Sequence, residues 1–144
     1  MAFLMRFIST DKSAPTTAEI VRALNKSDRA YGLGAHGELL YGGDIYALFE
    51  VFDKDDEQFE EEIEEFLESL DDYKGDAHKQ VRKVLKKARW MVVLQVLFAN
   101  RETETVLNRI DPIWQILANY CDGLLQVDGE GFYEAGELIL AESL

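Results

Sequence analysis

The sequence predicts an α+β fold from three features. Short apolar runs typical of strands, such as Ala2–Ser9 and Trp90–Ala99, alternate with longer segments whose apolar residues recur at helical spacing. A Gly42–Gly43 pair separates two further strand-like runs, which is the pattern of a β-hairpin. The order β-α-β-β-α-α-β-α-β contains the β-α-β-β-α-β ferredoxin-like motif if the two adjacent helices count as one. We expect a single domain over residues 1–144, a two-layer sandwich of about five strands with helices on one face, in which a helix and a strand are appended to the ferredoxin-like core.

Local signals mark the first strand and the first helix. Ala2–Ser9 is an apolar run that contains Arg6 and is short enough for a strand at the centre of a sheet. Thr16 and Glu19 form the Ser/Thr-x-x-Glu pattern of a capping box, which predicts a helix over residues 17–26. The apolar stripe of this helix consists of Ile20, Val21 and Leu24.

Residues 37–52 predict a hairpin whose second strand is apolar on both faces. The runs Gly37–Tyr41 and Asp44–Phe52 flank Gly42–Gly43, a two-residue turn that requires positive φ angles. One face of the second strand carries Ile45, Ala47, Phe49 and Val51, and the other carries Tyr46, Leu48, Glu50 and Phe52. If helices pack on one face only, something else must cover the other.

Two helices of opposite charge follow. In residues 53–72 apolar residues recur at helical spacing and nearly every other position is Asp or Glu, whereas in residues 74–89 Lys and Arg surround the stripe. Gly75 marks a short loop, so the two helices should lie antiparallel with their apolar stripes on the sheet. The next run, Trp90–Ala99, is apolar almost throughout, as in a strand buried on both faces.

The last third of the chain predicts a helix and an edge strand. Residues 103–120 have helical periodicity, and Asp111–Pro112 reads as an N-cap followed by the first position of a second helical segment. We therefore expect a kink or a restart there. Gly123–Val127 is expected to be an edge strand, and a short terminal element follows around Leu138–Leu140.

Charge and cysteine content restrict the possible partners. The net charge of −13 opposes binding to nucleic acids and to anionic membranes, but it is compatible with a basic protein partner. The single cysteine, Cys121, forms no intramolecular disulfide, and its neighbours Tyr120 and Asp122 would not activate a thiolate. No membrane-spanning run or signal peptide is recognisable, so we expect a cytoplasmic protein.

One acidic segment is similar to a calcium-binding loop. The ligand positions are occupied by Asp53, Asp55, Glu57 and Glu64. Gln58 stands where such a loop needs a glycine, so the sharp turn is missing. A strand end followed by an acidic helix start accounts for the segment better, because acids favour the positive end of the helix dipole.

A second acidic segment is rich in glycine. It contains Asp128, Glu130, Glu134 and Glu137. These carboxylates would suit a bound cation or, as a pair, glycoside hydrolysis. A turn with solvated acids is the simpler interpretation.

Other candidate residues complete no known pattern. His36 and His78 are isolated from each other and from Cys121, so no metal spacing is present. Gly32, Gly34 and Gly37 precede strands rather than a helix, which excludes a dinucleotide-binding loop. The serines occur in no Gly-x-Ser-x-Gly context. We predict no catalytic, cofactor-binding or metal-binding residue and no cofactor, and a non-enzymatic role is favoured.

The leading functional hypothesis is a protein-interaction or regulatory module that homodimerises. Its basis is a set of aromatic residues on strands whose second face is also apolar: Tyr46, Phe52, Trp90 and Phe98. If helices cover one face only, a second copy of the sheet is the simplest cover. Otherwise the terminal segment folds over that face.

Two alternatives remain open. One is a small-molecule-binding or hydrolytic domain that uses acids such as Glu50, Asp128 or Glu130 in a cleft between sheet and helices. The other is an inhibitor or immunity-type protein that presents the acidic helix 53–72 to a basic partner, although a solvated helix face explains these charges more simply. A concave pocket with convergent polar groups would favour the first, and a broad apolar or charged face an interaction module.

Two segments resemble known sequences. DGLLQVDGEGFYEAGELIL (Asp122–Leu140) and GELLYGGDIYALFEV (Gly37–Val51) are similar to an uncharacterised bacterial protein family of unknown function and similar length. The resemblance implies a bacterial protein, and it assigns no activity, cofactor, partner or site residue.

Overall fold

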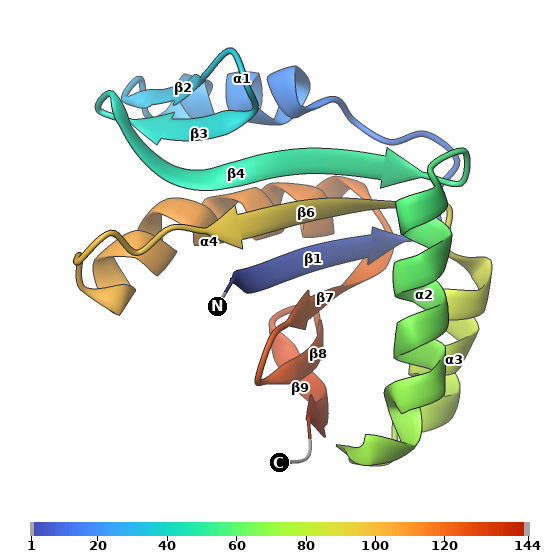
Figure 1. The fold of residues 1–144 in the computed structure, drawn as a ribbon. Helices are drawn as coiled ribbons and strands as arrows, with labels where there is room; N and C mark the ends of the chain where they lie inside the picture. Colours follow the sequence, from blue (N-terminus) through green and yellow to red (C-terminus); the bar gives the residue numbers. More distant parts are fainter. Residues whose placement is uncertain (1, 143–144) are drawn as a thin grey trace.

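The computed structural model describes residues 2–142, in which a nine-stranded antiparallel sheet carries four helices (Figure 1). The strands lie in the order β2-β3-β4-β6-β1-β7-β8-β9-β5. They are β1 (Phe3–Ser9), β2 (Tyr31–Leu33), β3 (Glu38–Tyr41), β4 (Asp44–Asp53), β5 (Tyr73–Lys74), β6 (Trp90–Val96), β7 (Gly123–Val127), β8 (Gly131–Glu134) and β9 (Glu137–Glu142). The helices are α1 (Thr17–Ser27), α2 (Glu57–Ser69), α3 (His78–Lys87) and α4 (Thr103–Tyr120), and a 3-10 turn, η1 (Leu70–Asp72), follows α2.

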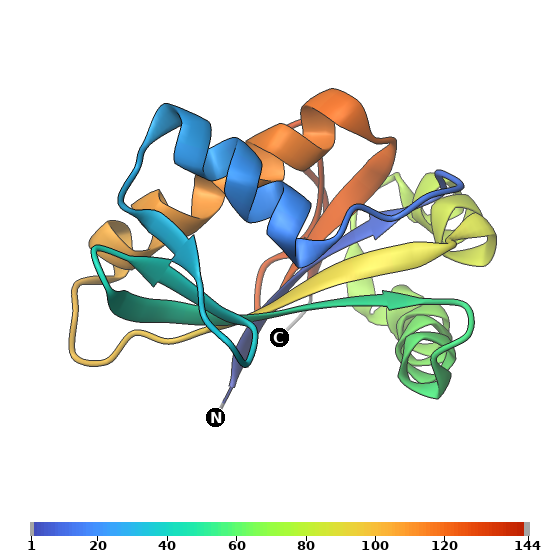
Figure 2. The ribbon, with the colours of Figure 1, turned by 90° about the horizontal axis from the view of Figure 1, so that it is seen from above.

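The helices pack on both faces of the sheet. Helices α1 and α4 lie on one face, and α2 and α3 lie side by side on the other, as the view from above shows (Figure 2). Alternate residues of one strand serve the two faces: Phe7 of β1 packs in the core beneath α1 and α4, and Ile8 packs in the core beneath α2 and α3. The two cores are called the α1–α4 core and the α2–α3 core below.

The predicted two-layer, ferredoxin-like sandwich is therefore wrong, although the α+β class is correct. The sheet has nine strands, and α2 and α3 cover part of its second face. Ile8, Met91 and Leu124 lie on that face, and α2 and α3 bury them almost completely. The apolar character of both faces was visible in the sequence, but the segment that covers the second face was not.

The C-terminal strands β8 and β9 account for half of the difference in strand number, and the short strands β2 and β5 account for the rest. Gly123–Val127 was predicted as an edge strand, but β7 lies inside the sheet between β1 and β8. Beyond it, β8 pairs with β9, and β9 pairs with the two-residue strand β5. The prediction of a central first strand is confirmed, because β1 lies between β6 and β7.

Several local predictions are confirmed. The Thr16 hydroxyl accepts a hydrogen bond from the Glu19 backbone N–H, and the Glu19 carboxylate accepts one from the Thr16 N–H, both at 3.1 Å, at the start of α1. Gly42 and Gly43 have φ angles of 59° and 84° in the turn between β3 and β4. Such angles are those of a two-residue hairpin turn.

Helix α4 differs from the expectation of a restart at Pro112. It continues from Thr103 to Tyr120 with Pro112 inside it, so Asp111 is a mid-helix residue and not an N-cap. Pro112 has no N–H to donate to the carbonyl of Asn108, a loss that the packing of Ile110, Ile113 and Trp114 on the sheet offsets. Within residues 2–142 no helix is long and apolar enough to cross a membrane.

Candidate functional site

A groove runs between helix α4 and strands β7 and β8, on the face of the sheet that carries α1 and α4. It consists of two adjoining hollows of about 520 and about 350 Å³, which share Trp114, Gln115, Leu125, Tyr133 and Gly136. We call it the α4 groove. Its remaining lining residues are Phe3, Met5, Phe7, Leu107, Asp111, Ala118, Asn119, Gly123, Val127, Glu130 and Ala135.

The apolar floor of the groove follows from strand alternation. Leu125 and Val127 are two residues apart on β7, so both point to the same face of the sheet. Tyr133 of β8 is the register partner of Leu125 and stands beside it. Phe7 and Met5 of β1 continue this floor, and both are almost fully buried in the α1–α4 core. Because the floor belongs to the core, its shape is preformed.

The opposite wall is one face of α4. Leu107, Asp111, Trp114, Gln115 and Ala118 recur at intervals of three and four residues, which brings them to the same side of the helix. Trp114 is only 6% exposed and lines both hollows. Its indole Nε1 is buried and has no hydrogen-bond acceptor within the described part of the chain. A buried donor without a partner costs free energy and calls for an explanation.

Polar groups gather at the rim, near the turn between β7 and β8. The Tyr133 hydroxyl donates a hydrogen bond to Oε1 of Glu130. This bond and the negative charge of Glu130 raise the pKa of Tyr133 to about 12, so the hydroxyl remains a neutral donor at physiological pH. The side chain of Asp111 is open to solvent at the rim. Partial loss of hydration raises the pKa of its carboxyl group, and the nearby charge of Glu130 raises it further.

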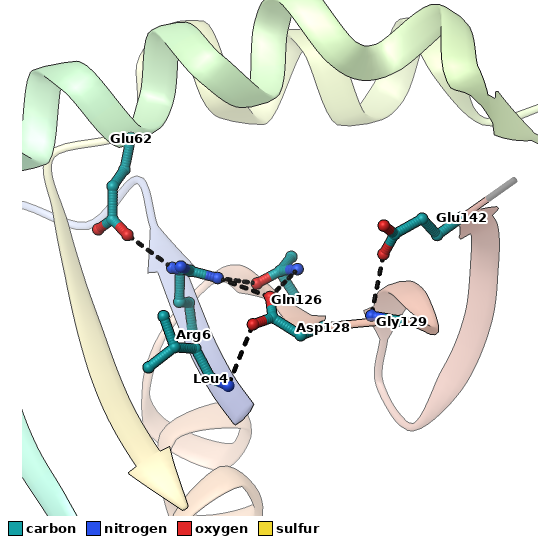
Figure 3. Close-up of polar contacts among 7 residues, drawn as sticks. All are labelled: Leu4, Arg6, Glu62, Gln126, Asp128, Gly129 and Glu142. Atoms are coloured by element: carbon teal, nitrogen blue, oxygen red, sulfur yellow. Dashed lines mark hydrogen bonds and ion pairs between the residues drawn. The ribbon is translucent and has the colours of Figure 1, made fainter. Parts of the chain in front are cut away.

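On the other face of the sheet, a cluster of polar residues surrounds Arg6 (Figure 3). Arg6 is 8% exposed; its Nε donates to Glu62 of α2 at 2.9 Å, and its Nη1 donates to Gln126 at 2.7 Å and to Asp128 at 3.0 Å. The guanidinium also lies over the ring of Phe66, 5.2 Å from its centre. The second oxygen of Glu62 is buried without a hydrogen-bond partner in residues 2–142. We call this set the Arg6 cluster.

The Arg6 cluster holds the turn that carries Glu130. Asp128 accepts a hydrogen bond from the backbone N–H of Leu4 at 3.1 Å and donates its own N–H to the Leu4 carbonyl at 3.1 Å. On the far side of the turn, the Glu142 carboxylate accepts the N–H of Gly129 at 2.9 Å (Figure 3). The turn is therefore fixed to β1 and β9 at once, and Glu130 has a defined place at the rim of the α4 groove.

The glycine-rich acidic segment does not form a cation site. Asp128 belongs to the Arg6 cluster, Glu130 lies at the groove, and Glu134 accepts a hydrogen bond from Gln80 at 2.6 Å. Glu137 is exposed in β9. Within residues 2–142 no three or more His, Cys, Asp or Glu side chains come together as metal ligands.

The calcium-like segment is a strand end followed by a helix start, as predicted. β4 ends at Asp53, and α2 begins at Glu57. Asp53 Oδ1 accepts the N–H of Asp55, and Asp56 Oδ2 accepts the N–H of Asp53, both at 2.9 Å. These carboxylates therefore satisfy backbone donors of the turn.

The other candidates lie apart from the groove. Glu50 is exposed on the opposite face of the sheet, where it is the register partner of Val93. His36 is exposed in the turn before β3, and the Nε2 atom of His78 lies 2.8 Å from the Tyr73 carbonyl oxygen. Burial and the charges of Asp11 and Asp122 raise the pKa of the Cys121 thiol, which disfavours a nucleophilic thiolate as predicted.

Of the residues at the groove, the sequence singled out only Glu130 as a cleft acid. Asp111 was assigned to an N-cap and residue 114 to a helix, and Tyr133 was given no role. The available signal was a carboxylate at position 111 on the helix face that also carries Leu107 and Trp114. No protein-family model, curated protein or solved structure matches this chain.

Proposed function

We propose that this chain binds a small, largely apolar molecule in the α4 groove. The observation that carries the proposal is the groove itself, because its hollows of about 520 and about 350 Å³ lie in the size range of ligand sites. Its floor is apolar and its rim carries a few polar groups, namely Asp111, Gln115, Glu130 and Tyr133. Such a combination is typical of sites that bury the body of a ligand and orient it by one polar end.

The state of the floor side chains supports binding without rearrangement. Leu125 and Tyr133 are half-buried in the free chain and pack against the α1–α4 core. An apolar ligand would remove their remaining surface from water, which contributes about 25 cal/mol per Å². Because these side chains are already held by the core, little conformational entropy is lost on binding.

The test is a titration with 2-phenylethanol, followed by the indole N–H signals in a nitrogen-15-labelled sample. The chain has two tryptophans, and only Trp114 lines the groove, so Trp90 in the core serves as an internal reference. We expect a saturable shift of the Trp114 signal with a dissociation constant on the order of 1 mM, which suits a ligand of this size.

A matched pair of variants locates the binding site. Ala118 is exposed and lines the larger hollow, so Ala118→Phe should fill it and weaken binding about tenfold, the loss of a few favourable contacts. Thr105→Phe introduces the same side chain at an exposed position of α4 outside the groove and should leave binding unchanged. A Trp114 signal that does not move, or an equal response of the Ala118→Phe variant, would reject the proposal.

A second candidate is self-association through the part of the sheet that α2 and α3 leave open (Figure 1). Trp90 and Tyr46 are buried within the chain itself, so they need no cover from a second copy. Ile45 and Leu48, however, are 42% and 38% exposed. Leu48 is the register partner of Gln95 in β6. It lies two residues from Glu50 on β4 and therefore on the same face of the sheet. This apolar surface favours a homodimer, which remains a prediction.

The acidic-helix hypothesis also remains a prediction. Exposed acids occupy six positions of α2: Glu57, Glu60, Glu61, Glu64, Glu65 and Glu68. None of them forms an ion pair within the described residues. The negative electrostatic potential of such a surface would attract a basic partner. A helix face that is exposed to solvent and binds no partner would carry the same exposed acids.

A further inference from the structure

The charges at the α4 groove are all of one sign. Among its lining residues, all within the described chain, Asp111 and Glu130 are the only acids, and Lys, Arg and His are absent. Both carboxylates line the same hollow, and the charge of Glu130 contributes to raising the pKa of the Asp111 carboxyl group. The polar end of the groove is therefore negative, and none of its described lining residues carries a positive charge.

This pair of carboxylates carries an electrostatic cost that a cation would remove. Burial in the groove raises the pKa of the Asp111 carboxyl group, and the like charge of Glu130 raises it further. A positive group between them interacts favourably with both charges and replaces hydration that the groove has already taken away. A negative group would add a third like charge.

The aromatic walls suit the same kind of group. Trp114 and Tyr133 line both hollows, and aromatic faces attract cations through their ring quadrupole. The net charge of −13 further favours the approach of cations over anions.

We propose that the α4 groove selects a small protonated amine with an apolar body, its ammonium group held between Asp111 and Glu130. The apolar part lies on the floor formed by Leu125 and Val127, beside Trp114. This inference rests on the proposed binding function and adds the chemical class of the ligand. The Tyr133 hydroxyl, which donates to Glu130, orients that carboxylate toward the site as a positioning residue.

The experiment compares three probes of nearly equal size: 2-phenylethylamine, 2-phenylethanol and phenylacetate. Each is titrated at pH 7 and moderate salt with the indole N–H signal of Trp114 as the readout. An exposed ion pair contributes up to about 1 kcal/mol, or roughly fivefold, so two carboxylates predict a preference of about tenfold for the amine over the alcohol. Phenylacetate should bind more weakly than the alcohol.

Charge-neutral variants then assign the preference to the two carboxylates. The double variant Asp111→Asn with Glu130→Gln keeps the shape of the rim and should abolish the preference, so that the amine and the alcohol bind this variant with equal affinity. Glu104→Gln removes an exposed acid of α4 outside the groove and should leave the preference at about tenfold, which controls for the net charge.

The outcomes separate the two proposals. If the alcohol binds and the amine binds no better, the groove is a ligand site and the inference about the amine is wrong. The same holds if the double variant keeps the preference, or if Glu104→Gln lowers it equally. If none of the three probes moves the Trp114 signal, the binding function is wrong and the inference falls with it.

Discussion

At the scale of single residues, Arg6 is the most consequential charged side chain of the fold. It is buried between the sheet and α2, where it is bound to Glu62, Gln126 and Asp128. Arg6→Met would leave Glu62, whose side chain is 15% exposed, without its cation. Breaking a buried ion pair from one side costs about 3–5 kcal/mol, and the 35% exposure of Asp128 places the expected loss near about 3 kcal/mol. Denaturant unfolding would measure it.

The surface pair Arg82–Asp71 provides the control. Its atoms are 3.9 Å apart, and the two side chains are 39% and 93% exposed, so Arg82→Met should change the free energy of unfolding by less than about 0.5 kcal/mol. The double variant Arg6→Met with Glu62→Leu should recover part of the loss, because it also removes the buried Glu62 oxygen that has no partner. Equal effects of Arg6→Met and Arg82→Met would show that the Arg6 cluster is not a stabilising centre.

At the scale of elements, the pairing of β8 with β9 depends on Gly131. It has a φ of 135°, and a Cβ atom there would collide with the backbone carbonyl oxygen of Leu140 in β9. Gly129, in the same turn, has a φ of 80° but open space around it. Both positions share the left-handed penalty of about 1–2 kcal/mol, so Gly129→Ala isolates that term. Gly131→Ala should destabilise the protein by a further 1–3 kcal/mol or so, the usual cost of overpacking.

The loss of stability caused by Gly131→Ala should also be localised to the strands β8 and β9. Gly131→Ala is expected to increase the hydrogen exchange of the amides in β9 before those in β1, because β9 pairs with β8 on one side and, within the described chain, with just the two-residue strand β5 on the other. If the two glycine variants were equally stable, the β8–β9 pair would accommodate the added methyl group without loss of free energy, and the prediction would be wrong.

Elements with local signals were predictable, and elements made by distant pairing were not. Thr16 with Glu19 marks the start of α1, and Gly42–Gly43 marks the hairpin, because neighbouring residues alone satisfy the groups concerned. Asp111–Pro112 carries an equally clear N-cap signal, yet α4 continues through it because its apolar face packs on the sheet. The strands β8 and β9 have no strong periodicity of their own and are stabilised by pairing with each other and with β7.

At the scale of the whole molecule, the sequence indicates that both faces of the sheet need cover and does not say which segment supplies it. Residues 90–96 are apolar on both sides, and that pattern fits helices on both faces as well as a dimer. The α4 groove could not be predicted from the sequence for the same reason. Its walls come from α4 and from the β7–β8 hairpin, and only tertiary packing brings Asp111 next to Glu130.

The part of the sheet that α2 and α3 leave uncovered is the expected interface of a homodimer. Leu48 is 38% exposed on that face, and Leu138 is 44% exposed on β9 at the other end of the sheet. If two copies pair through the open face, native mass spectrometry should show a dimer for the unmodified chain and for Leu138→Glu. Leu48→Glu should be a monomer, because the partner would have to bury an unpaired carboxylate. Since both leucines are exposed, neither variant should unfold. A monomeric unmodified chain, or a Leu48→Glu variant that still forms dimers, would rule out this interface, whereas extra mass on a monomer would point back to a ligand in the α4 groove.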